Sequence, residues 1–176
     1  MKNCIKGVFG LRIIGIDPGY AIIGYGIVDY NNSAFNVVNY GAITTKANTP
    51  FEARLEIIYK DMCELLETFK PEFLSIEKLF FNTNATTAID VAQARGVIVL
   101  AAQKYGVKVF EYTPLQVKQA VTGYGRAEKN QIMEMTRKML SLSKMPKPDD
   151  TADALALAVC HAYVGGSSLN KIKRGI

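Results

Sequence analysis

The distribution of apolar residues changes along the chain from a period of two to a helical period. Up to Thr44, three apolar or alternating runs at 11–18, 20–30 and 34–44 are separated by Gly, Pro and Asn, which predicts three β-strands. Their short connections favour an antiparallel meander. The segment 1–10 precedes this pattern, and we expect it to form a leader with little structure of its own.

A helix and a further strand follow the meander. Apolar residues recur at helical spacing over 51–69, with Pro50 at the first helical position and a capping-box pattern formed by Thr49 and Glu52. A proline ends this helix, and the short apolar run 72–77 predicts a fourth strand. Because a helical crossover joins this strand to the meander, we expect it to lie parallel to the first strand.

The remainder of the chain predicts one more strand and four more helices. The strand covers 107–112, and the helices cover 86–105, 114–121, 127–142 and 151–164. Together these elements describe one α/β domain at 11–165, with a five-stranded mixed sheet flanked by helices. The basic segment 166–176 is expected to be a short C-terminal tail.

The composition is that of an ordinary soluble globular domain. Apolar residues make up 49% of the chain and charged residues 21%, and no apolar run approaches the ~20 residues of a membrane helix. Cys4, Cys63 and Cys160 are an odd number without a Cys-x-x-Cys pair, which predicts free thiols packed as small hydrophobes. We therefore expect a cytoplasmic protein.

The net charge of +5 is unevenly distributed. Between Lys104 and Lys147 the chain carries nine Lys or Arg residues and three Glu. A basic half favours a polyanionic partner, although solvated helix faces carry the same kind of charge. The pattern alone leaves both interpretations open.

Two of the predicted strands end on a carboxylate. The first ends on Asp17 and the fourth on Glu77. If these strands are parallel neighbours, both carboxylates emerge at the same edge of the sheet, where open α/β sheets place their sites. Taken singly, each acid has a structural explanation, since Asp17 can cap a turn and Glu77 can pair with Lys78 or another base.

The last predicted helix is preceded or begun by further acids. Asp150 and Asp153 are three residues apart, Asp149 and Asp153 are four apart, and either pair lies on one helical face. Asp149 or Asp150 can also act as a helix N-cap. Asp153 is harder to explain structurally, because it lies among alanines and leucines that should pack on the sheet.

A cluster of three or four carboxylates needs a cation or must retain protons. Unit charges about 4 Å apart repel by roughly 4 kcal/mol at an effective dielectric near ~20. Because no His-rich or Cys-rich set accompanies these acids, oxygen ligands favour Mg²⁺ or Mn²⁺ over zinc. Two such ions ~3.5–4 Å apart can activate a water and stabilise the leaving 3′ oxygen of a phosphodiester.

Five ordered blocks of sequence resemble the RuvC family of bacterial Holliday junction resolvases. They are GIDPG at 15–19, IEKLFF at 76–81, QARGV at 93–97, QVKQAVTGYGRAEKNQ at 116–131 and DDTADALALAVCH at 149–161. The resemblance implies an RNase H-like fold and a homodimer that nicks two opposed strands of a four-way DNA junction with Mg²⁺. It also implies a branch-migration helicase complex, RuvA and RuvB, as a partner in recombination and DNA repair.

The resemblance also assigns four acids to the site. The acidic tetrad of the family falls on Asp17, Glu77, Asp150 and Asp153. Asp150 is preferred to Asp149 because the family pattern places one acid three residues before the other. Spacing alone does not exclude Asp149.

Candidate DNA contacts follow from the same resemblance. The junction-contacting aromatic of the family falls on Phe80, with Phe81 as a helper, although alternation along a strand favours a core position for one of the two. Lys118 and Lys129 fall on basic positions that contact DNA, with a solvated helix face as the alternative. Arg126 is a further candidate for a phosphate contact.

Other interpretations carry their own sequence features. A smaller RuvC-like family that processes ribosomal RNA precursors shares a GIDPG-like start, but the FF and QVKQ residues argue against it. An actin-like ATPase or sugar kinase needs two such domains around a nucleotide, and a catalytically silent DNA-binding module would not need all four acids.

His161 lies about two helical turns from the acids, so we expect a core or helix-end role for it. The unusually apolar helix 86–105 is the candidate dimer surface.

Overall fold

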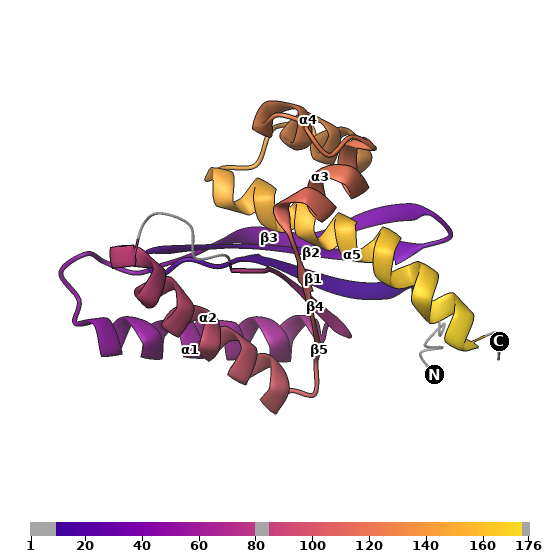
Figure 1. Ribbon diagram of the computed structural model, residues 1–176. Coiled ribbons are helices and arrows are strands. Elements are labelled where there is room, and N and C mark those ends of the chain that lie inside the picture. Colours follow the sequence, from indigo (N-terminus) through magenta and orange to yellow (C-terminus); the bar gives the residue numbers. More distant parts are fainter. Residues whose placement is uncertain (1–9, 80–84, 174–176) are drawn as a thin grey trace.

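The computed structural model describes residues 10–79 and 85–173, and it shows a five-stranded sheet with helices on both faces (Figure 1). The strands are β1 (Leu11–Asp17), β2 (Ile22–Asn31), β3 (Ala34–Thr44), β4 (Phe73–Glu77) and β5 (Lys108–Tyr112). They lie in the order β3-β2-β1-β4-β5. Because β1 pairs antiparallel with β2 and parallel with β4, and β2 pairs antiparallel with β3, the predicted meander and the predicted parallel fourth strand are confirmed.

The helices lie on opposite faces of the sheet (Figure 1). They are α1 (Phe51–Phe69), α2 (Ala85–Lys104), α3 (Pro114–Thr122), α4 (Lys129–Met139) and α5 (Asp149–Lys173). α1 and α2 pack together on one face, and α5 crosses the other face over β1 and β2. α3 and α4 pack on α5 on its side away from the sheet. No helix within the described ranges combines the length and the apolar character of a membrane span.

The start of α1 differs from the capping box predicted at Thr49. Pro50 occupies the cap position in an extended conformation, and no side chain caps the helix there. Thr49 instead belongs to the preceding turn, where its N–H donates to the Lys46 carbonyl at 3.1 Å. Because the helix begins one residue later than predicted, Glu52 stands one position before the place where a capping box needs its acid.

α4 is shorter and α5 longer than the sequence pattern predicts. Glu128 starts α4 through a capping box with Gln131, and Ser141 adopts a left-handed φ of 52° just beyond its end. α4 therefore occupies only the middle of the predicted segment 127–142. α5 begins two residues before the predicted segment 151–164 and continues past it, because adjacent glycines lower helix propensity without ending a helix.

Alternate residues of the central strands face two separate cores. In β1, Ile13 packs on the α5 side, whereas Ile14 and Ile16 pack on the side of α1 and α2. β4 repeats this pattern, with Phe73 toward α5 and Leu74 toward α1 and α2. These side chains are at most 5% exposed. Burial on both faces explains why β1 and β4 are nearly continuous apolar runs.

α5 approaches the sheet closely because glycines lie beneath it. A Cβ added to Gly15 would lie 1.9 Å from the Ala154 carbonyl oxygen. One added to Gly24 would lie 2.0 Å from the Asp150 carbonyl oxygen. The backbone of α5 therefore rests directly on β1 and β2, where any side chain would displace it.

Two buried hydroxyl groups fasten α5 to the sheet. Ser75 in β4 donates to the Leu157 carbonyl at 2.7 Å. Thr151 in the first turn of α5 donates to the Gly41 carbonyl at 3.0 Å. Both side chains are fully buried, so each bond satisfies a polar group that would be costly to leave unpaired.

His161 lies in the core between α5 and the strands β4 and β5, as the sequence predicts. Its fully buried ring packs on Phe73 and Phe110, and Nδ1 lies 2.7 Å from the Tyr112 hydroxyl oxygen. Burial lowers the pKa of His161 to about 4, because the charged imidazolium would lose its hydration. The histidine is therefore a neutral core residue at pH 7.

The cysteines in the described part of the chain are free thiols. Cys63 is partly buried and Cys160 is fully buried, which confirms the prediction for these two. Burial raises the pKa of the Cys160 thiol to about 12, so it stays protonated. Cys4 lies outside the described residues.

Gly15→Ala should destabilise the protein by roughly 2–4 kcal/mol, because the added methyl group would displace α5 from β1. Gly96→Ala in α2 is the matched control. A Cβ there meets nothing within 4 Å, and alanine favours a helix over glycine by up to ~1 kcal/mol. Urea denaturation of both variants measures the difference. A Gly15→Ala variant as stable as wild type would contradict the close packing of α5.

The stability of wild type should fall more steeply below pH 6.5 than that of a His161→Phe variant. The pKa of His161 is about 4 when folded and about 6.5 when unfolded, so the unfolded state binds an extra proton between these values. The stabilising contribution is present above pH 6.5 and is lost as the pH falls toward 4. From pH 7 to about pH 4.5 the excess loss should be roughly 2 kcal/mol, measured by urea denaturation. If the free energies of unfolding of wild type and His161→Phe changed in parallel with pH, His161 would not be the cause of the acid destabilisation.

Candidate active site

β1 and β4 deliver their terminal acids to the same face of the sheet. Gly15 lies beneath α5, and the alternation of a strand turns Asp17 to that side as well. Ser75 bonds to α5, and Glu77 follows it by the same alternation. Because β1 and β4 are parallel neighbours, the two acids lie at one edge of the sheet, as the sequence predicts.

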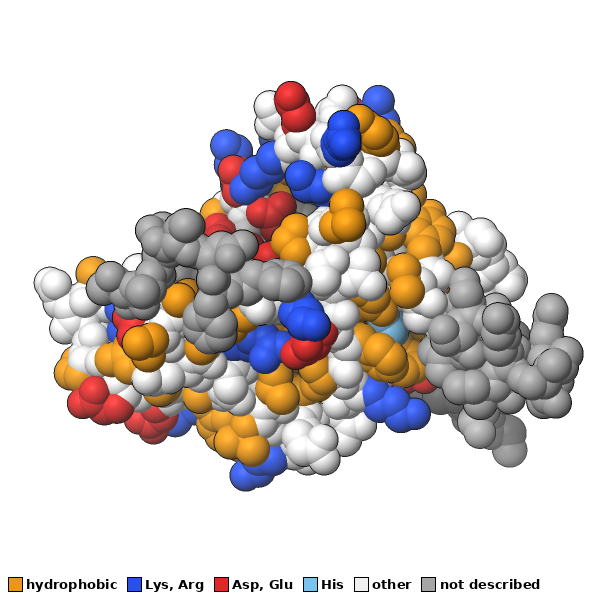
Figure 2. Space-filling view, viewed as in Figure 1, with side chains coloured by type: hydrophobic (Ala, Val, Ile, Leu, Met, Phe, Trp, Pro, Cys, Tyr) orange, Lys and Arg blue, Asp and Glu red, His pale blue; other side chains and the backbone are white. Residues whose placement is uncertain are grey.

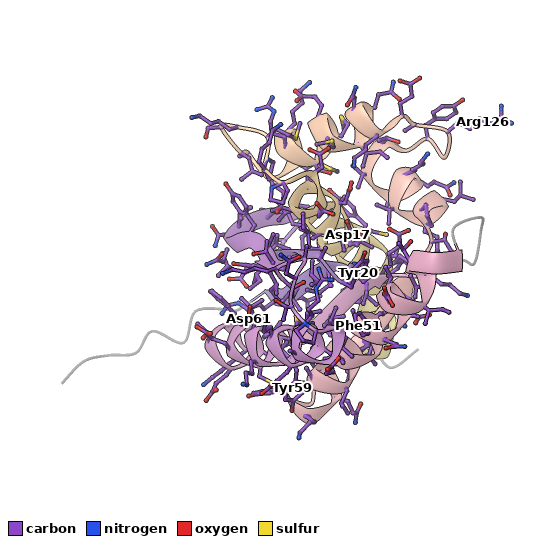
Figure 3. The ribbon with its side chains drawn as sticks, turned by 90° about the vertical axis from the view of Figure 1, so that its left-hand side faces the viewer. Asp17, Tyr20, Phe51, Tyr59, Asp61 and Arg126 are labelled. Carbon is purple, nitrogen blue, oxygen red and sulfur yellow. The ribbon has the colours of Figure 1, made fainter. Side chains whose placement is uncertain are left out.

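The start of α5 brings further acids to this edge. Gly24 pairs with Asp17 across the β1–β2 ladder and lies directly beneath the backbone of Asp150. Asp153 follows about one turn later and, like Asp17, is partly buried. Figure 3 shows Asp17 near the middle of the molecule, where α5 crosses the sheet. The acids of the sheet and of the helix therefore lie at the same edge of the sheet.

The four acids act on one another electrostatically. Burial, followed by the charges of Asp153, Glu77 and Asp150, raises the pKa of Asp17 to about 7. Burial and then the Asp153 charge raise the pKa of Glu77, and burial raises the pKa of Asp153. Each negative charge makes its neighbours harder to ionise. The raised pKa values therefore mean that nearby positive charge does not fully offset the negative charge of the cluster.

Lys129 places a basic side chain against these acids. Its Nζ lies 3.1 Å from Asp153 Oδ2 and 3.7 Å from Asp149 Oδ2. The hydrogen bond with Asp153 raises the pKa of Lys129, and the ammonium charge offsets part of the rise in the pKa of Asp17. Asp149 thus contacts the lysine, whereas Asp150 is one of the charges that act on Asp17.

The donor set fits a hard divalent cation, although the carboxylates do not converge on one point. Across residues 10–79 and 85–173, no three His, Cys, Asp or Glu side chains are close enough to hold a metal ion. The acids supply only carboxylate oxygens, which Mg²⁺ and Mn²⁺ prefer. The raised pKa values of Asp17 and Glu77 reflect burial and uncompensated negative charge, which a bound cation would neutralise.

The residues predicted to contact DNA lie in different places. Lys129 is at the acids, and Lys118 is partly buried on α3. Arg126 is exposed on the loop between α3 and α4 and points outward, away from the acids (Figure 3). Phe80 and Phe81 lie outside the described residues.

Lys and Arg side chains lie on the side of the acids toward α4 (Figure 2). Figure 2 shows acidic side chains near the start of α5, with Lys and Arg side chains gathered above them around α4. α4 begins with Lys129 at the acids, and in its last turn it carries Arg137 and Lys138, which both pair with Glu134. A polyanion that approaches the acids would therefore meet cations on this helix.

Arg95 in α2 contacts the acid-bearing end of β4, and sequence reasoning did not single it out. Its Nε donates to the Glu77 carbonyl at 3.4 Å, and its guanidinium pairs with Glu111 of β5. The only sequence signal is an arginine among the apolar residues of α2, within the QARGV block. Arg95 ties α2 to the strand end that carries Glu77.

A five-stranded mixed sheet of this order, with helices on both faces, is the RNase H-like fold. The yeast mitochondrial Holliday junction resolvase Ydc2 shares the fold, with a TM-score of 0.64 at 14% identity over 88% of this chain and 79% of its own. The structure of Thermus thermophilus RuvC in complex with a Holliday junction substrate is more similar. Its TM-score is 0.86 at 34% identity, over 90% of this chain and 96% of its own.

The chain belongs to the RuvC family. The family model for crossover junction endodeoxyribonuclease RuvC matches residues 13–161. The crossover junction endodeoxyribonuclease RuvC of Brevibacillus brevis is 59% identical over 152 residues, which cover 86% of this chain and 92% of that protein. These matches confirm the family and the RNase H-like fold that the five sequence blocks imply.

Proposed function

We propose that this chain is a structure-specific endonuclease that resolves four-way DNA junctions by paired, symmetric nicks. The observation that carries the proposal is the meeting of four acids from β1, β4 and α5 at one edge of the sheet. Membership of the family of crossover junction endodeoxyribonucleases supports the substrate class. A Thermus thermophilus relative was solved with a Holliday junction substrate, which supports it further.

In this proposal the acid cluster holds divalent metal ions, Mg²⁺ or in its place Mn²⁺. The ligands are Asp17, Glu77, Asp150 and Asp153. These four carboxylates would hold the ions, which when bound would supply an activated water and charge stabilisation at the leaving 3′ oxygen. Asp17 and Glu77 end paired, buried strands, and the start of α5 rests on Gly24, so the backbone holds the ligands in position.

The basic and aromatic residues position the DNA. Lys129 and Lys118 contact phosphates near the scissile bond, and Arg126 contacts the backbone farther out. Phe80 and Phe81 follow β4, where an aromatic ring can stack on a base at the unpaired junction centre. Such stacking is worth ~1–3 kcal/mol per base.

A two-fold homodimer would place a second active site on the opposing strand, because a four-way junction is itself pseudo-two-fold. α2 is the candidate dimer surface. Its Ile89 and Leu100 side chains are 60% and 54% exposed. Covering these apolar side chains in a dimer would remove them from water. A helicase complex of RuvA and RuvB, implied by the family resemblance, would bring the junction to the dimer.

A synthetic four-way DNA junction, labelled on each strand in turn, should be nicked at paired, symmetric positions with Mg²⁺ and not with EDTA. Denaturing gels measure the products. Tight binding without nicks under Mg²⁺ or Mn²⁺ would instead indicate a junction-binding module. Preferential cleavage of structured RNA would indicate an RNA-processing nuclease.

Asp17→Asn should reduce nicking by more than ~100-fold while leaving junction affinity within about twofold, because it removes a metal ligand and no DNA contact. Asp61→Asn in α1 is the matched control, since Figure 3 shows Asp61 on a helix away from Asp17. That variant should nick like wild type. Gel-shift and cleavage assays on the same junction measure both properties. If Asp17→Asn nicked as well as wild type, Asp17 would not be a metal ligand.

A further inference from the structure

Lys129 occupies an unusual position for a lysine. It is the first residue of α4, which Glu128 caps through a capping box with Gln131. Cations are disfavoured in the first turn of a helix, because the helix dipole is positive there. The ion pairs of Lys129 with the acids of α5 offset this unfavourable interaction with the helix dipole.

The ammonium group bridges two acids of α5. Nζ lies 3.1 Å from Asp153 Oδ2 and 3.7 Å from Asp149 Oδ2. Its charge also reaches Asp17 at the end of β1. Lys129 therefore supplies part of the positive charge that the clustered carboxylates lack.

We propose that Lys129 is the resident counter-cation of the acid cluster, and that its ammonium group and a divalent metal ion compete for the same carboxylates. This inference rests on the metal site proposed above. The ammonium group holds Asp153 through Oδ2, and a divalent ion bound by the same carboxylate would repel the ammonium charge at short range. Metal binding therefore releases the lysine side chain.

The release has a consequence for the DNA. The Lys129 side chain is 55% exposed and has a long flexible stem, so its ammonium group can move away from Asp153 without rearranging the core. Once free of the acids, it can contact a phosphate beside them. The same residue thus stabilises the metal-free site and binds substrate in the metal-loaded one.

Calorimetric titration of the full chain with Mg²⁺ alone, without DNA, tests the competition. Lys129→Met should bind Mg²⁺ roughly tenfold more tightly than wild type, because a charge-assisted hydrogen bond no longer holds Asp153. Lys138→Met is the matched control, with the same charge change on the same helix but an ion pair to Glu134 instead. Its Mg²⁺ affinity should stay within about twofold of wild type.

Thermal unfolding provides a second readout that does not depend on activity. In EDTA, Lys129→Met should unfold at a lower temperature than wild type, because the acids lose their counter-cation. In saturating Mg²⁺ this gap should close or reverse. Lys129→Arg keeps the positive charge and should restore most of the stability in EDTA.

The outcomes separate this inference from the proposed function. If wild type binds Mg²⁺ but Lys129→Met binds it equally or more weakly, with the same stability gap in EDTA and Mg²⁺, the competition is wrong and the metal site stands. If wild type binds neither Mg²⁺ nor Mn²⁺, the proposed metal site itself fails, and the exchange fails with it.

Discussion

The close contact of α5 with β1 and β2 is the constraint on which the site depends. Gly15 and Gly24 leave no side chain between helix and sheet, so backbone meets backbone. Asp150 lies in the turn that rests on Gly24, and Asp17 is the partner of Gly24 in β1. The packing of α5 on β1 and β2 therefore forms part of the core and also fixes the positions of the helix acids relative to the strand acids.

That packing also places negative charge where water is scarce. Burial is the largest cause of the raised pKa at Asp17, Glu77 and Asp153. The apolar turns of α5 that follow, from Ala154 to Ala162, are almost completely buried and favour the folded state. The hydrophobic packing of α5 holds these acids close together although their negative charges repel one another. A bound cation would relieve this repulsion.

Local pattern predicted most of the elements, and the errors have local causes. β3 begins and ends where the alternation predicts, and α3 begins at the predicted Pro114. The start of α1 was misplaced because the capping-box pattern at Thr49 is not used, and the start of α4 was misplaced because Glu128 is its cap. Periodicity measures which face of an element is apolar, and it carries no information about a single cap.

The sequence by itself determined which acids end the central strands and begin the last helix, and the parallel crossover that brings Asp17 and Glu77 to one edge. These follow from chain order and period, which are properties of neighbouring residues. Only the tertiary structure decided that Lys129 lies against Asp153 and that Arg95 bonds to the Glu77 strand end. Such pairs join residues far apart in the chain, and their distances depend on how closely helices pack on the sheet.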